Sequence, residues 1–125
     1  MREIVKTFKA LSDDTRLRIL NLLMERECCV CEVMQVLDIS QSKASRHLSA
    51  LYDAGFLQLR RKGLWSEYYI DKSSMKKYCI DLIKAADEAL ADEEIASRDR
   101  ERLRKAERIG PSCIRQMKCN MGENI

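Results

Sequence analysis

Three cysteines lie within four residues of one another, at Cys28, Cys29 and Cys31. Thiolates are soft ligands, so this cluster suits As(III), Sb(III), Cd(II), Pb(II), Zn(II) or Cu(I). A structural zinc ion takes four ligands, whereas the cluster supplies three and has no histidine beside it. Trivalent arsenic binds three thiolates in a pyramid, with its lone pair in the remaining direction. Ligand number therefore favours As(III) or Sb(III), and the alternative interpretation is three small buried hydrophobic side chains.

The other three cysteines, Cys79, Cys113 and Cys119, are additional candidate ligands. Cys79 falls on the apolar stripe of a predicted helix, which favours packing in the core or in a dimer interface. Cys113 and Cys119 are separated by five residues near the C-terminus, where a second soft-metal site and solvated thiols are both open interpretations. The single histidine, His47, has neighbours that we expect to face DNA, so we do not predict it to bind metal.

The cysteine cluster lies at the start of a predicted helix. Val30, Val33, Met34 and Leu37 are spaced at i, i+3, i+4 and i+7, which indicates a short amphipathic helix. Successive residues of a helix are rotated by about 100°, so Cys29 and Cys31 would point to different sides. Binding one ion to all three sulfurs should therefore distort the first turn, and we expect this distortion to act as a switch.

A second helix and a hairpin follow. Ser40 is a suitable N-cap for a helix over residues 41–54, which Gly55 ends. Two short helices joined by a tight polar turn form a helix-turn-helix candidate. Alternating residues over 56–62 and 66–70 predict two strands around a turn at 62–65.

The remaining segments are mostly helical. Ser12-Asp13 caps a predicted core helix over residues 13–26, and a long helix follows residues 71–74. The chain of 125 residues contains only 4 glycines and 1 proline, so we predict a mainly α protein with a small β-hairpin, in the α+β class. We expect one domain over residues 1–97. Residues 98–125 are predicted to be a charged helical extension with a mobile, cysteine-containing tail.

Positive charge is concentrated on the helix-turn-helix and hairpin. Residues 41–66 contain five basic side chains and one acid, whereas residues 85–108 contain six basic side chains and eight acids. Polar residues at the start of the second helix suit base reading in the major groove, and a basic hairpin suits phosphate contact. The basic candidates are Lys43, Arg46, Arg60, Arg61 and Lys62. We therefore predict double-stranded DNA as a partner.

Two other function classes are disfavoured. No apolar run of about 18 residues predicts a membrane span, and residues 1–8 lack a secretory h-region and a small-residue cleavage site. We therefore expect a cytoplasmic protein with thiols rather than disulfides. A cysteine-dependent enzyme such as an arsenate reductase needs a glycine-rich oxyanion cradle. The four glycines are isolated along the chain, so we predict no enzyme activity and no organic cofactor.

Two segments resemble the ArsR/SmtB family of metalloregulatory repressors. They are Leu11-Ser12-Asp13-Asp14-Thr15-Arg16-Leu17-Arg18-Ile19-Leu20 and Gln41-Ser42-Lys43-Ala44-Ser45-Arg46-His47-Leu48-Ser49-Ala50-Leu51, the latter followed by Ala54-Gly55-Phe56-Leu57. The resemblance covers residues 1–90 approximately and implies a dimeric winged helix-turn-helix fold, paired through the first and last helices. It also implies that the recognition helix carries Gln41, Ser42, Ser45, Arg46 and His47.

The cysteine cluster resembles one branch of that family. Cys29-Val30-Cys31-Glu32-Val33 is similar to the box of arsenic-responsive ArsR repressors, in which a third cysteine can follow at the position of Met34. Cys28, or a later cysteine of the same or the other subunit, is then the third ligand. The family's zinc-type site on the last helix needs histidines, and none follows His47. The resemblance implies a homodimeric repressor released from its operator by As(III) or Sb(III).

Three rival functions use the same scaffold. A redox or persulfide sensor needs only two thiols, one of them with a lowered pKa. A Cd(II) or Pb(II) sensor would use the same soft ligands. A DNA-binding protein without an effector would use none of them.

Overall fold

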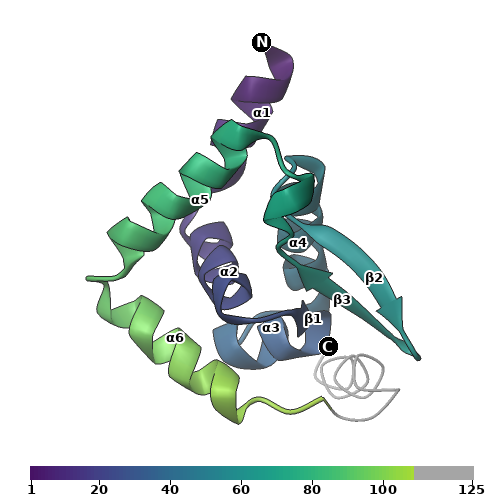
Figure 1. Cartoon of the computed structure of the whole chain (residues 1–125). Helices are drawn as coiled ribbons and strands as arrows, with labels where there is room; N and C mark the ends of the chain where they lie inside the picture. The colour runs from purple at the N-terminus through teal and green to yellow at the C-terminus, as the bar shows by residue number, and fades with distance from the viewer. Residues whose placement is uncertain (109–125) are drawn as a thin grey trace.

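A computed structural model describes residues 1–108. The helices are α1 (Arg2–Leu11), α2 (Asp14–Glu25), α3 (Val30–Leu37), α4 (Gln41–Asp53), the short 3₁₀ helix η1 (Lys72–Ser74), α5 (Lys77–Leu90) and α6 (Glu94–Lys105). The strands are β1 (Cys28–Cys29), β2 (Gln58–Lys62) and β3 (Trp65–Tyr69). None of the helices described is long and apolar enough to cross a membrane. Figure 1 shows α5 and α6 along one side of the molecule and the β2–β3 hairpin projecting from the other.

The predicted helix-turn-helix is formed by α3 and α4, which pack on α2. Asp38 ends α3 in the left-handed conformation, with φ of 55°. Ser40 then caps α4, because its side-chain oxygen accepts a hydrogen bond from the Lys43 backbone N–H at 3.1 Å. Gly55 follows α4 at φ +96°, a conformation that other residues rarely adopt. Local capping thus fixes both boundaries that the sequence predicts.

The hairpin strands β2 and β3 belong to a three-stranded antiparallel sheet in the order β1-β3-β2, with β3 in the centre. Arg60 pairs with Glu67 and Lys62 with Trp65, with Gly63 in the connecting turn. The sequence pattern predicts β2 and β3 but not β1, because it places Cys28 and Cys29 at a helix start. These two residues instead pair with β3, Cys28 with Tyr68 and Cys29 with Glu67. We call the β2–β3 hairpin the wing.

Helix α6 is an integral part of the packed core. Leu103 is completely buried, and α6 contacts both α2 and α3. The buried Asp99 accepts two hydrogen bonds from Arg18 of α2, at 2.8 and 3.0 Å. The predicted domain boundary between residues 97 and 98 therefore falls inside a helix that packs on the winged domain. The rest of the predicted tail, residues 109–125, lies outside the described residues.

Candidate functional site

Cys29 and Cys31 place their sulfur atoms side by side, with Sγ–Sγ 2.7 Å apart. Both residues are completely buried and, with Trp65 packed against them, form a small cluster separate from the main core. Cys29 is the N-cap of α3 and has an extended backbone, at φ −87° and ψ 166°. The helical rotation expected to separate the sulfurs does not apply, because only Cys31 belongs to the helix. No unwinding of α3 is needed to bring this sulfur pair together.

Cys28 belongs to a different part of the molecule. Successive side chains of an extended strand point to opposite faces, and Cys28 packs into the main hydrophobic core while Cys29 does not. Its thiol donates to the Arg26 carbonyl oxygen at 3.5 Å, and burial raises its pKa. Cys28 is thus separated from the pair formed by Cys29 and Cys31. Within residues 1–108 no three Cys, His, Asp or Glu residues are grouped to hold a metal ion.

Burial also controls the protonation of Cys29. Desolvation raises the pKa of its thiol to about 11, although the Glu32 backbone N–H favours the charged form. Cys29 is therefore a protonated thiol at neutral pH. A ligand that reacts with it must replace a proton as well as enter a closed space.

Two buried carboxylates flank the sulfur pair. Glu32 of α3 is 2% exposed and accepts a hydrogen bond from the Cys29 backbone N–H at 2.9 Å. Glu67 of β3 is 1% exposed and is the register partner of Cys29. Arg108, three residues beyond the end of α6, joins them: its Nε lies 3.0 Å from Glu32 Oε1 and its Nη1 2.7 Å from Glu67 Oε2. Its guanidinium also lies over the Trp65 ring, 5.5 Å from the centroid.

We call Arg108 with its two carboxylates the Arg108 bridge. Burial would raise the pKa of Glu67, but the hydrogen bonds from Arg108 and Arg60 lower it overall. Burial opposes ionisation of Glu32 in the same way, and the Cys29 N–H, Arg26 and Arg108 reverse the effect. Both groups are therefore charged at neutral pH. Sequence reasoning missed this bridge: Glu67 is a lone acid in a strand, and nothing near Arg108 in the chain indicates its partners.

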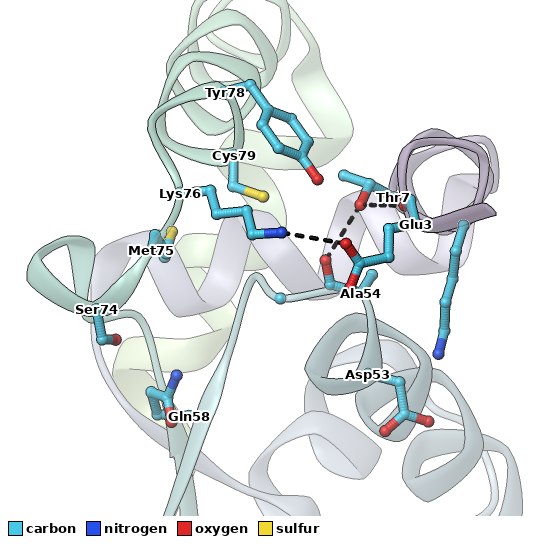
Figure 2. A pocket seen from close by; sticks show the side chains of 12 residues that line it. Glu3, Thr7, Asp53, Ala54, Gln58, Ser74, Met75, Lys76, Tyr78 and Cys79 are labelled. Carbon is cyan, nitrogen blue, oxygen red and sulfur yellow. Dashed lines mark hydrogen bonds and ion pairs between the residues drawn. The ribbon is translucent and has the colours of Figure 1, made fainter. Parts of the chain in front are cut away.

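Cys79, an additional candidate ligand, lies away from the sulfur pair. It lines a cavity of about 240 Å³ between α1, the end of α4 and the start of α5, which Figure 2 shows from close by. The Lys76–Glu3 ion pair and Thr7 lie beside it, with Thr7 Oγ1 donating to the Glu3 carbonyl oxygen at 2.8 Å. Burial raises the pKa of Cys79. Cys113 and Cys119 lie outside the described residues.

The predicted DNA-contacting residues occupy two exposed regions. On α4, Ser42, Lys43 and Arg46 are exposed and Gln41 and Ser45 are half-buried, with Gln41 donating to Ser45 Oγ at 3.3 Å. On the wing, Arg61 and Lys62 are exposed beside Leu64, which is 68% exposed. Arg60 is also exposed, but its Nε lies 3.0 Å from Glu67 Oε1 and its guanidinium stacks on Tyr69.

His47 differs from its neighbours on α4. It is only 7% exposed, and its Nδ1 lies 3.2 Å from Arg16 NH1 on α2. Burial lowers its pKa. The structure thus places His47 on the side of α4 that faces the protein, rather than with the exposed Lys43 and Arg46.

Residues 13–58, from the cap of α2 to the start of the wing, match the family model described as bacterial regulatory protein, arsR family. The chain is 42% identical to the uncharacterized HTH-type transcriptional regulator MJ1325 of Methanocaldococcus jannaschii, over 65% of this chain and 88% of that protein. This chain belongs to the arsR family.

Two other relatives have names that mention an element. The chain is 51% identical to the arsenic resistance transcriptional regulator ArsR1 of Pseudomonas putida, over 54% of this chain and 56% of that protein. It is 40% identical to a Staphylococcus aureus homologue of the cadmium resistance regulatory protein CadC, over 60% of this chain and 63% of that protein. The chain thus matches little more than half the length of these two relatives.

A solved structure has a similar fold. A homodimeric winged helix-turn-helix DNA-binding domain, Mb0332 of Mycobacterium bovis, matches with a TM-score of 0.60 and 28% identity, over 74% of this chain and 82% of that one. The mainly α, winged helix-turn-helix prediction is therefore confirmed. About a quarter of this chain has no counterpart in that structure.

Proposed function

We propose that this chain is a cytoplasmic, homodimeric DNA-binding repressor that As(III) or Sb(III) releases from its operator by bonding to Cys29 and Cys31. One observation carries the proposal: the two sulfurs meet, 2.7 Å apart, at the first turn of the helix that supports α4. The relative named for arsenic resistance supports the choice of ion. A ligand bound at this point can act on the DNA-reading helix without touching DNA.

The chemistry of arsenious acid fits the protonated thiol of Cys29. As(OH)₃ reacts with three thiols to form three As–S bonds, and each thiol proton leaves with an arsenic hydroxyl as water. No net proton is released. Binding of Cd(II) or Pb(II) would instead release these protons to solvent, which is unfavourable for a thiol whose pKa burial raises to about 11. Proton balance therefore favours the metalloid over the divalent ions.

The third sulfur is proposed to come from the C-terminal segment. Cys28 packs in the core and Cys79 lines a separate cavity. Cys113 follows Arg108 by five residues, which span up to about 17 Å when extended, and Arg108 itself lies beside the sulfur pair. We therefore propose Cys113 as the third ligand, and Cys119 of the same or the partner subunit is the alternative.

The DNA interface is proposed to use α4 and the wing. Exposed Ser42, Lys43 and Arg46 would enter the major groove, and Arg61 and Lys62 would contact phosphates. Helix α1 exposes Ile4, Val5 and Phe8, each more than 40% exposed, on a protein related to a homodimeric domain. We propose that a second copy of the chain covers this apolar surface.

The proposal is tested through the chain's single tryptophan, Trp65, which packs on the sulfur pair. Arsenite is titrated anaerobically into the reduced full chain, while Trp65 emission, the ultraviolet absorption of As–S bonds and the anisotropy of a labelled DNA selected from a random pool are recorded. We expect all three signals to change together and Cys29→Ser to abolish the arsenite response without lost DNA binding. Release of DNA from Cys29→Ser by arsenite would contradict the proposed site.

A DNA-contact variant completes this test. Arg46→Ala should weaken binding to the selected DNA by about 1–3 kcal/mol if Arg46 reads a base edge, and should leave the arsenite titration of Trp65 emission unchanged. An unchanged DNA affinity would remove Arg46 from the interface.

The close approach of the sulfurs supports one second candidate, a thiol redox switch. Peroxide would oxidise two thiols to a disulfide and be reduced to two waters. In that case peroxide alone releases DNA, and arsenite changes neither absorption nor anisotropy. The same titration therefore separates the two functions.

A further inference from the structure

We propose that Arg108 couples the sulfur pair to the wing, as a positioning residue whose bridge to Glu32 and Glu67 is closed in the DNA-binding form and opens when the metalloid binds. This inference rests on the proposed function and concerns how the same site is regulated.

Arg108 connects three elements that are far apart in the sequence. It follows α6, and its side chain, 19% exposed, reaches Glu32 on α3 and Glu67 on β3. Helix α3 packs on α4, and β3 is itself a strand of the wing, so Arg108 contacts both predicted DNA-contacting parts of the molecule. Because one guanidinium forms hydrogen bonds with both carboxylates, Arg108 adds a side-chain link between the wing and the helix-turn-helix, beside the β1–β3 strand pairing.

The bridge shares its atoms and its space with the sulfur pair. Glu32 Oε1 accepts from both Arg108 Nε, at 3.0 Å, and the Cys29 backbone N–H, at 2.9 Å. Trp65 packs on the two sulfurs and also lies under the Arg108 guanidinium. Cys29 and Cys31 are completely buried and Trp65 packs on them, so we expect Trp65 to move when an arsenic atom enters the site. Movement of Trp65 removes the ring on which Arg108 rests.

The bridge is built so that it can open without leaving a buried charge unpaired. Glu32 also pairs with Arg26 at 2.8 Å, and Glu67 also pairs with Arg60 at 3.0 Å. An uncompensated buried charge costs several kcal/mol, and these second partners avoid that cost when Arg108 leaves. The open and closed arrangements can therefore be close in free energy, as a ligand-controlled switch requires.

Opening the bridge also changes a cation of the wing. With Arg108 in place, Glu67 shares its charge between two guanidiniums, and the exposed Arg60 is only partly neutralised. Without Arg108, Arg60 is the one remaining cation paired with Glu67 among residues 1–108, and its positive charge is more fully neutralised. Metalloid binding would thus both loosen the wing and reduce its positive charge, and DNA binding would reciprocally weaken metalloid binding.

The test measures coupling in the full chain with three variants. Arg108→Met should bind the selected DNA about 10-fold more weakly than wild type without arsenite, within the range of ordinary allosteric effects. It should bind arsenite at least as tightly, by Trp65 emission, and the arsenite-induced loss of DNA affinity should shrink. Arg108→Lys should restore part of that coupling, because an ammonium group keeps the charge but lacks the fork for two carboxylates. Arg104→Met, on the exposed side of α6, should match wild type.

The outcomes separate this inference from the proposed function. If wild type releases DNA with arsenite and Arg108→Met shows the same DNA affinity and the same release, the coupling role of Arg108 is overturned and the metalloid function stands. If wild type gives no arsenite signal, the proposed function fails, and the inference fails with it. If Arg108→Met is unfolded by circular dichroism, the Arg108→Lys variant decides: wild-type coupling in it overturns the inference.

Discussion

Helix α6 and the residues after it are joined to the rest of the molecule by two buried ionic contacts that differ in one respect. Asp99 pairs with Arg18, and within residues 1–108 it has no other ionic partner. In the Arg108 bridge, both Glu32 and Glu67 keep a second arginine. Loss of the first contact leaves a buried charge alone, whereas loss of the second does not. Equivalent side-chain chemistry can therefore make a fixed joint at one place and a releasable joint at another.

Two adjacent cysteines also differ in their surroundings. Cys28 packs among aliphatic side chains of the main core, and Cys29 packs on Cys31 and Trp65. The strand β1 causes the division, because it sends consecutive side chains to opposite faces. We call the Arg18–Asp99 and Cys28 region the scaffold side, and the Arg108 bridge with the sulfur pair the sulfur side.

The largest effect is expected on the scaffold side. Arg18→Met should lower the free energy of unfolding by about 3 kcal/mol, because Asp99, with a side chain 1% exposed, loses its partner. The double variant Arg18→Met with Asp99→Leu should recover most of this loss, since no buried charge then remains. Urea unfolding of the three proteins measures both values.

The Arg18→Met variant should be unchanged in function. Arsenite-induced DNA release, measured at a temperature where Arg18→Met is folded, should be the same as in wild type. A weakened arsenite response in Arg18→Met would mean that the scaffold side also carries the signal, and the contrast between the two joints would be lost.

Much of this arrangement follows from the sequence, and the exceptions have a common cause. Local rules predict α3, α4 and the wing, because caps, a helix-ending glycine and apolar spacing act within a few residues. The strand β1 depends on pairing with β3, some 40 residues later, and no local pattern records it. On α6 the buried positions Ala96, Asp99 and Leu103 have helical spacing. An aspartate interrupts that stripe, so the sequence pattern predicts only a charged helical extension there.

The candidate site shows the same division. The softness and number of the cysteines predict a thiophilic ligand, but not which sulfurs share a face. The Arg108–Glu32 contact joins residues 76 positions apart, so it is visible only in three dimensions. The burial of His47 against Arg16, 31 positions away, is likewise a tertiary effect.

A smaller effect is expected from Cys28→Ala. Removing one buried sulfur from the core should lower the free energy of unfolding by about 1 kcal/mol, because the site is closely packed and completely buried. Arsenite binding, followed by Trp65 emission, should be unchanged, in contrast to Cys29→Ser, which should lose it. Equal loss in both variants would show that the two faces of β1 form a single site.

The smallest effect is expected from a third ionic contact of α6, which lies at the surface. Arg104 Nε is 3.0 Å from Glu25 Oε2, but the Arg104 side chain is 63% exposed. Water and salt screen such a pair, so Arg104→Ala should change the free energy of unfolding by less than about 0.5 kcal/mol and leave DNA affinity and arsenite release at wild-type values. Urea unfolding in low and high salt provides the measurement. A decrease in the free energy of unfolding as large as that of Arg18→Met would contradict this comparison. It would mean that the charges on α6 stabilise the helix whether or not they are buried.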